Sequence, residues 1–219
     1  MVLSELHATP TAGHSGFTKT YDSVKRSFFW DGMKQEIRKF VAKCEVCQCN
    51  KGETVKSLGT LQPLPIPPTI WKDISMDFIT GLPKSGNKSV IMVVVDRLSK
   101  YVHFCSLQHP FTSSIVAQLF MDKVFKLHDM PHSIVSDRDP TFTRNFWQEL
   151  FKLQGTQLHL SIAYDPLTNG QTKVVNKCLE TYLRCFSSER ENQWDQWLPL
   201  AKWWYNTSYY TSTRMTPFE

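Results

Sequence analysis

The sequence predicts two folded units: a small all-helical unit, followed by a larger α/β unit whose mixed sheet has helices on both faces. A proline-rich run, with four prolines from Pro63 to Pro68, divides the chain between them. Before this run apolar residues recur at helical spacing, and after it β-rich segments come first and then alternate with helical ones. That second order of elements is typical of an α/β domain.

The proline-rich run is expected to be an extended linker rather than part of either unit. Proline fixes its own φ angle, lacks an N–H donor and disfavours helix in the residue before it. We therefore expect a first domain at residues 1–55, a linker at 56–69 and a second domain at 70–219. A chain of 219 residues with 41% hydrophobic content is long enough for one ordinary domain and one small one.

In the first unit, the spacing of the apolar residues indicates helices. The Asp31-Gly32 pair is the expected break between two of them, because both residue types favour turns. The apolar positions that carry this pattern are Phe28, Phe29, Met33, Ile37, Phe40 and Val41.

The second unit begins with three β-rich runs separated by turn residues, which predicts a three-stranded meander. These runs are WKDISMDFIT, SVIMVVVDRLS and YVHFCSL. Further along, apolar spacing from Ile115 to Leu127 indicates a helix, HSIVSDRD a short strand, and the spacing from Phe146 to Leu153 a second helix. A third helix is expected to begin near Gly170.

The net charge favours a polyanionic partner without identifying one. Lys and Arg outnumber Asp and Glu by 25 to 20, which gives a formal charge of +5. No run of eighteen apolar residues occurs, and MVLSELHATPTAGH lacks the regions of a signal peptide, so we expect an intracellular protein without a membrane segment. In that setting the six cysteines are expected to be thiols or metal ligands rather than disulfides.

Two histidines and two cysteines in the first unit have the spacing of a zinc site. Six residues separate His7 from His14, and Cys44 and Cys47 form a C-x-x-C pair further along. Two imidazoles and two thiolates complete the tetrahedral set of a structural zinc ion. A helical unit of this size buries little surface, so a metal would stabilise it. Cys49 is an alternative ligand, but Cys44 and Cys47 already make the tight chelate loop.

Two aspartates in the second unit are candidates for a site that binds divalent metal ions. Asp77 lies within the predicted strand ISMDFIT, where an unpaired carboxylate is costly to bury. Asp137 follows the short strand IVS, and the neighbouring Asp139 could instead cap the turn before Pro140. Two-metal phosphoryl transfer needs carboxylates that converge on the ions. Hard oxygen ligands of this kind suit magnesium or manganese.

The sequence resembles the integrases of gypsy-type long-terminal-repeat retrotransposons in both units. The segments GHSGFTKT, FFWDGM and FVAKCEVCQCNK are similar to their HHCC zinc domain, and MDFITGLP, VDRLSKYVHF and IVSDRDPTFTRNFW to their catalytic core. The resemblance implies an RNase H-like fold with a D, D-35-E triad, in which Asp77 and Asp137 hold Mg²⁺ or Mn²⁺. It also implies that His7, His14, Cys44 and Cys47 bind zinc, and that the zinc domain helps multimerisation and binding of element ends.

At the position of the third carboxylate the chain departs from the family pattern. Thirty-five residues separate Asp137 from position 173, where the family's GQTERVN reads GQTKVVN. An ammonium about 4 Å from a divalent ion is opposed by roughly 8 kcal/mol at an effective dielectric near 20. Lys173 is therefore expected to turn away or to exclude the metal. Glu180 lies about 10 Å further along the helix axis and is not expected to reach the metals. Asp165, in the loop before the helix, is a conceivable replacement that no further sequence feature supports.

The third predicted helix is the expected DNA-binding surface. Amide and cationic side chains suit contacts to phosphates and bases, although the same residues would also suit a solvated helix face. The residues concerned are Gln171, Lys173, Asn176, Lys177 and Arg184. The aromatic residues from Trp194 to Tyr205 have helical spacing and are expected in the core instead. The histidines of the second unit show no ligand spacing.

Two functions remain open for this sequence. The first is an integrase that trims DNA ends and joins them to double-stranded target DNA, as a homo-oligomer, in the nucleus. The second is a non-catalytic remnant that binds DNA or protein, which Lys173 favours. A ribonuclease H would need a glutamate between residues 112 and 128, where none occurs. The resemblance also implies a polyprotein with reverse transcriptase and RNase H, and a chain that continues past TSTRMTPFE into a further domain.

Overall fold

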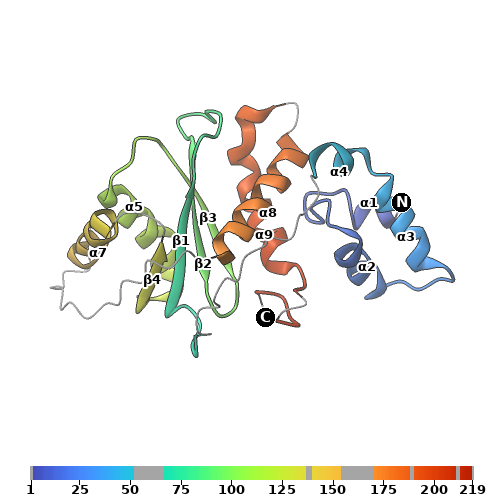
Figure 1. Ribbon diagram of the computed structural model, residues 1–219, viewed down its shortest axis with the longest axis horizontal. Coiled ribbons are helices and arrows are strands. Elements are labelled where there is room, and N and C mark those ends of the chain that lie inside the picture. The colour runs from blue at the N-terminus through green and yellow to red at the C-terminus, as the bar shows by residue number, and fades with distance from the viewer. Residues whose placement is uncertain are drawn as a thin grey trace. The chain divides into compact units, whose positions relative to one another are not determined.

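The computed structural model describes residues 2–51, 67–136, 140–153, 170–187, 190–210 and 213–218 (Figure 1). The chain forms two compact units. Unit 1 combines Met1–Leu61 with Lys177–Glu219, and unit 2 is Gln62–Asn176. The predicted domain boundaries at residues 55 and 70 stay predictions, because the linker between them lies almost entirely outside the described residues.

The N-terminal part of unit 1 is helical. It contains α1 (Val2–Glu5), α2 (Phe17–Lys25), α3 (Met33–Ala42) and α4 (Glu45–Asn50). Val24, Met33 and Ile37 form its buried core. Gly32 precedes α3 with a φ of 78°, a left-handed conformation that glycine adopts without a Cβ penalty, so the predicted break lies where the sequence placed it.

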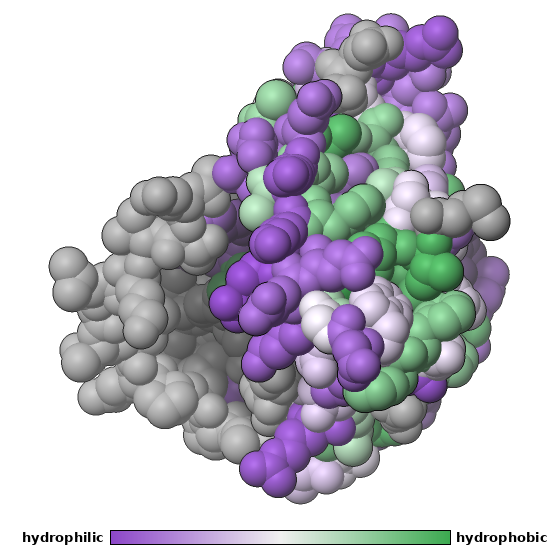
Figure 2. All heavy atoms as spheres, turned by 90° about the vertical axis from the view of Figure 1, so that its right-hand side faces the viewer, coloured by the Kyte–Doolittle hydropathy of each residue, from purple (hydrophilic) through white to green (hydrophobic). Residues whose placement is uncertain are grey.

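Two apolar residues of the predicted helical pattern lie outside the helices. Phe28 and Phe29 follow α2 in the loop before α3 and are 44% and 86% exposed. Figure 2 views the molecule from the side of these N-terminal helices, where hydrophobic side chains are exposed between hydrophilic ones. The helical spacing of these two residues was therefore misleading, because Lys25 ends α2 before the pattern begins.

The C-terminal part of unit 1 packs against the N-terminal helices. It contains most of α8 (Gly170–Ser187), a 3₁₀ helix η2 (Glu191–Trp197) and α9 (Leu198–Thr207). The Tyr182 hydroxyl donates to the carbonyl of Pro10 at 2.8 Å, and Trp204 Nε1 donates to Ser15 Oγ at 3.0 Å. Trp194, Trp204 and Tyr205 are buried as expected, whereas Trp203 is 54% exposed.

Unit 2 contains a four-stranded mixed sheet. Its strands are β1 (Asp73–Ile79), β2 (Val90–Asp96), β3 (Val102–Leu107) and β4 (Ser133–Ser136), in the spatial order β3-β2-β1-β4. The first three pair antiparallel, which is the predicted meander, and β4 pairs parallel with β1. Ser136, the last residue of β4, pairs with Met76.

Helices lie on both faces of this sheet. On one face, α5 (Ser113–Phe120) and α7 (Pro140–Leu153) pack on alternate residues of β1, namely Ile74, Met76 and Phe78. A π-helix η1 (Met121–Phe125) and a short α6 (Lys126–His128) continue α5. Asp77 points to the opposite face, where Asn176 of α8 contacts it. Among the described helices, none combines the length and the apolar content of a membrane crossing.

Candidate metal centres

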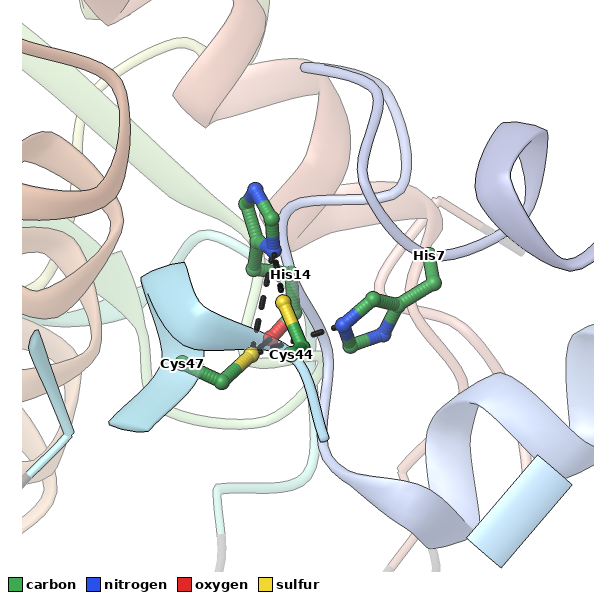
Figure 3. Close-up of side chains that lie close together, drawn as sticks. All are labelled: His7, His14, Cys44 and Cys47. Atoms are coloured by element: carbon green, nitrogen blue, oxygen red, sulfur yellow. Dashed lines mark hydrogen bonds between the residues drawn. The ribbon is translucent and has the colours of Figure 1, made fainter. Parts of the chain in front are cut away.

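The side chains of His7, His14, Cys44 and Cys47 point toward one another in unit 1 (Figure 3). One ligand atom from each residue lies within 4.8 Å of all the others. His14 Nδ1 is 3.4 Å from Cys44 Sγ and 3.7 Å from Cys47 Sγ, and His7 Nε2 is 3.4 Å from Cys47 Sγ. Cys49 is exposed and outside this cluster.

These separations fit a tetrahedral zinc ion. Zinc binds histidine nitrogen at about 2.0 to 2.1 Å and cysteine sulfur at about 2.3 Å, which sets nitrogen and sulfur ligands about 3.6 Å apart. The three nitrogen–sulfur distances, 3.4, 3.4 and 3.7 Å, lie close to that value. The four side chains could therefore hold zinc as a complete N₂S₂ ligand set.

Local backbone structure positions each zinc ligand. Cys44 precedes α4 and Cys47 lies within its first turn, so the helix places the two sulfurs on one face. His14 follows Gly13 in a loop in which both residues have positive φ, 45° and 68°. His7 lies two residues past the end of α1 and is fully buried.

A hydroxyl on α2 holds His7 in the tautomer that zinc needs. Thr20 Oγ1 donates to the carbonyl of Ser15 at 3.1 Å, so its oxygen is left to accept from His7 Nδ1 at 3.3 Å. With the proton on Nδ1, the lone pair of His7 Nε2 faces the cluster. Such outer partners orient the ligand ring and raise its basicity.

Electrostatics keep the two imidazoles neutral and therefore able to bind metal. Burial, together with His14 and Lys51, lowers the pKa of His7 to about 4. Burial and Lys51 also lower the pKa of His14. Burial raises the pKa of the Cys47 thiol while Lys51 acts in the opposite direction, and Lys51 Nζ donates to the carbonyl of His14. A divalent cation favours the thiolate strongly.

The second candidate centre is Asp77 in unit 2. Its partly buried carboxylate accepts from the Phe78 N–H through Oδ1 and from Asn176 Nδ2 through Oδ2, each at 2.7 Å. Ser136 ends β4 beside Met76, the residue before Asp77. Asp137, which follows Ser136, lies outside the described residues, as do Asp139 and Asp165.

The predicted DNA-contacting residues have different environments along α8. Lys173 and Lys177 are exposed, whereas Asn176 is partly buried against Asp77. Arg184 pairs with Glu180 at 3.8 Å. The side chain of Gln171 lies outside the described residues, and contact of these residues with DNA stays a prediction.

Three contributors to these centres were not found from the sequence. Thr20 and Lys51 support the zinc ligands, and Asn176 was assigned to DNA rather than to Asp77. Spacing could not reveal the Asn176 contact, because 99 residues separate it from Asp77.

Two family models match this chain in the order of its predicted domains. The model of the integrase zinc binding domain matches residues 1–53, and that of the integrase core domain matches residues 67–166. Both matched regions of the chain are therefore integrase domains. This assignment confirms the resemblance predicted from the sequence, and the zinc-domain match agrees with the clustered ligands.

Relatives of this integrase chain occur in fission yeast. The Tf2-3 and Tf2-4 transposon polyproteins of Schizosaccharomyces pombe are each 33% identical over 218 residues, which is 100% of this chain. The chain spans only 16% of the length of these polyproteins.

Solved structures support the RNase H-like integrase fold. The simian T-cell lymphotropic virus intasome, in complex with PP2A regulatory subunit B56 gamma, matches with a TM-score of 0.60 and 18% identity, covering 96% of this chain and 71% of that one. The HTLV-2 integrase catalytic core in complex with magnesium matches with a TM-score of 0.51 and 19% identity, covering 68% of this chain and 94% of that one.

Proposed function

We propose that this chain acts in DNA integration, by processing DNA ends and joining them to target DNA, and that Lys173 impairs both steps in this copy. The observation that carries this proposal is the combination of residues at the positions of the first and third family carboxylates. Asp77 supplies a partly buried carboxylate on β1, while α8 presents an exposed lysine at the position of the third family carboxylate.

Asp77 and Asp137 are the residues that would hold magnesium or manganese. The hydrogen bond from the Phe78 N–H fixes the carboxylate of Asp77 on the face of the sheet opposite α5 and α7. HTLV-2 integrase, whose core shares this fold, was solved in complex with magnesium. When bound, such ions activate the attacking oxygen and stabilise the leaving oxygen of the phosphoryl transfer.

Lys173 removes one ligand from this arrangement. Its side chain is exposed, and a protonated amine offers no lone pair to a metal ion. The acidic residue of α8 is Glu180, which is partly exposed and lies 3.8 Å from Arg184. Loss of about 3 kcal/mol of transition-state stabilisation lowers a rate by roughly 160-fold.

The proposed partners follow from the family. We propose double-stranded DNA as substrate, a homo-oligomer as the acting form, and the nucleus as the place of action. The fission-yeast relatives are polyproteins, which supports a polyprotein that also carries reverse transcriptase and RNase H. The zinc unit would aid multimerisation and binding of element ends.

Manganese-dependent strand transfer on a short blunt DNA duplex tests the catalytic proposal. We expect the wild-type chain to give background product and Lys173→Glu to raise the rate at least about 100-fold. The matched control is Lys177→Glu, which makes the same charge change at an exposed position one turn further along α8. It should stay at background.

The double variant Lys173→Glu, Asp77→Asn is expected to lose the restored activity, because Asp77 is the first metal ligand. If the wild-type chain is itself active and Asp77→Asn abolishes that activity, another acid completes the site and the role given to Lys173 is wrong. If Lys173→Glu stays inactive while its zinc content and circular dichroism match wild type, the catalytic assignment is wrong.

A second candidate function is DNA binding without catalysis, which the exposed Lys173 favours because its charge attracts phosphate. Fluorescence anisotropy with a labelled duplex at several salt concentrations measures this contribution. If Lys173 contacts a phosphate, Lys173→Gln should reduce the slope of log K against log salt by about 0.9. An unchanged slope excludes that contact.

A further inference from the structure

The amide of Asn176 has an unusual environment at the Asp77 site. Its Nδ2 donates to Asp77 Oδ2 at 2.7 Å, whereas its Oδ1 is buried and accepts no hydrogen bond from the described residues. Buried side-chain oxygens nearly always have a partner, so an unpaired one needs an explanation. Here the unpaired oxygen belongs to a side chain that already contacts a proposed metal ligand.

The amide group suits a second arrangement in which oxygen faces Asp77. Oxygen and nitrogen of an asparagine amide are nearly isosteric, and rotation of the amide by 180° exchanges them. After that rotation Asn176 Oδ1 takes the place of Nδ2, which is 2.7 Å from Asp77 Oδ2. Adjacent oxygens around octahedral magnesium, at bond lengths of 2.0 to 2.1 Å, lie about 2.9 Å apart. The observed separation therefore matches a pair of oxygen ligands that share one ion.

The position of Asn176 on α8 explains why it is the residue available. It follows Lys173 by three residues, which places the two side chains on the same side of the helix within one turn. Lys173 is exposed, while Asn176 reaches the carboxylate of Asp77. An oxygen donor is thus retained on α8 although the carboxylate at position 173 is absent.

We propose that Asn176 Oδ1 is a metal ligand in this chain, and that it binds Mg²⁺ or Mn²⁺ together with Asp77 in place of the lost carboxylate. This inference rests on the proposed function, because it assumes that Asp77 binds the metal. An amide oxygen carries no formal charge, so the resulting site binds metal more weakly than one with a third carboxylate. The alternative role of Asn176 is structural, as a hydrogen-bond donor that holds Asp77.

Manganese titration followed by electron paramagnetic resonance distinguishes the two roles, because it measures free Mn²⁺ without any activity. The zinc-loaded 219-residue chain is compared with Asn176→Leu and Asp77→Asn. We expect Asn176→Leu to weaken Mn²⁺ binding about tenfold and Asp77→Asn to abolish it. Asn192→Leu, an exposed asparagine in unit 1, is the matched control and should bind as wild type.

The outcomes separate this inference from the proposed function. If Asn176→Leu binds Mn²⁺ like wild type while Asp77→Asn does not, Asn176 is structural and the Asp77 metal site stands. If Asp77→Asn also binds like wild type, the metal site of the proposed function is wrong as well.

A measurement on the unmodified chain decides the case in which Asn176→Leu does not fold. Asparagine labelled with ¹³C at Cγ reports directly on the side-chain carbonyl, and titration with Mg²⁺ should shift the Asn176 resonance. That resonance is identified by its absence from Asn176→Asp. A Cγ resonance that does not move at saturating Mg²⁺ overturns the proposal.

Discussion

The zinc site and the Asp77 site differ in how the fold brings their ligands together. The zinc ligands come from two short segments of unit 1, His7 to His14 and Cys44 to Cys47, and all four lie among the described residues. At the Asp77 site, β1 and α8 contribute groups that are 99 residues apart in the chain. A structural zinc ion contributes folding free energy to its unit, whereas the sheet of unit 2 has a hydrophobic core that does not depend on a ligand at position 173.

The largest expected effect is loss of the zinc ion from unit 1. Cys47→Ser removes a buried thiolate from the centre of the cluster, and structural zinc sites contribute folding free energy directly. We expect unit 1 to lose at least about 5 kcal/mol of stability and bound zinc to fall to zero. Zinc content by atomic absorption and thermal unfolding by circular dichroism measure the two effects.

Cys49→Ser is the matched control, because Cys49 is exposed and lies outside the cluster. It should keep one zinc ion per chain and its melting temperature. Zinc loss in Cys49→Ser together with retention in Cys47→Ser would exchange the roles of the two cysteines and contradict the assigned ligand set.

A smaller effect is expected where the zinc loop packs on α9. A Cβ at Gly13 would lie 2.2 Å from Trp204 Nε1, and Gly13 has a φ of 68°. Gly13→Ala should therefore destabilise the chain by about 3 kcal/mol, from overpacking and left-handed strain together. Urea unfolding at saturating zinc measures this loss.

Gly32→Ala separates strain from packing, since Gly32 has a similar φ of 78° but open space around its would-be Cβ. It should cost only about 1 kcal/mol. Equal losses of stability in Gly13→Ala and Gly32→Ala would show that the close approach of Gly13 to Trp204 adds nothing to the cost of the substitution.

The contrast between local sequence patterns and long-range contacts explains how much of the molecule could be predicted from the sequence. The meander followed from alternating β-rich runs and turns, and the zinc ligands followed from spacing, because in both cases the decisive pattern is local. Phe28 and Phe29 misled the helix prediction, since apolar spacing does not show that α2 ends at Lys25. The Asn176 contact could not be foreseen, because only the folded chain brings α8 against β1.

The next smaller effect is expected at a residue that contacts a zinc ligand without binding zinc itself. Thr20→Val removes the hydroxyl that links His7 Nδ1 to the Ser15 carbonyl while keeping the branched shape of the side chain. We expect zinc affinity to fall about 10- to 100-fold, measured by competition with a chelator. Thr18→Val, at an exposed position of the same helix, should leave affinity unchanged. A Thr20→Val protein with wild-type affinity would show that the hydroxyl does not orient His7.

The smallest expected effect concerns Glu180, the acidic residue of α8, which we expect not to replace the lost carboxylate. Glu180 is seven residues beyond Lys173, about 10 Å along the helix axis, and it lies 3.8 Å from Arg184 in a solvent-exposed pair. Glu180→Gln should therefore change stability by less than about 0.5 kcal/mol and leave Mn²⁺ affinity within about twofold of wild type. A tenfold loss of Mn²⁺ affinity in Glu180→Gln would mean that α8 moves to bring this carboxylate to the metal. The Asp77 site would then be completed by a charged ligand from the same helix, and the amide of Asn176 would not be needed to explain metal binding.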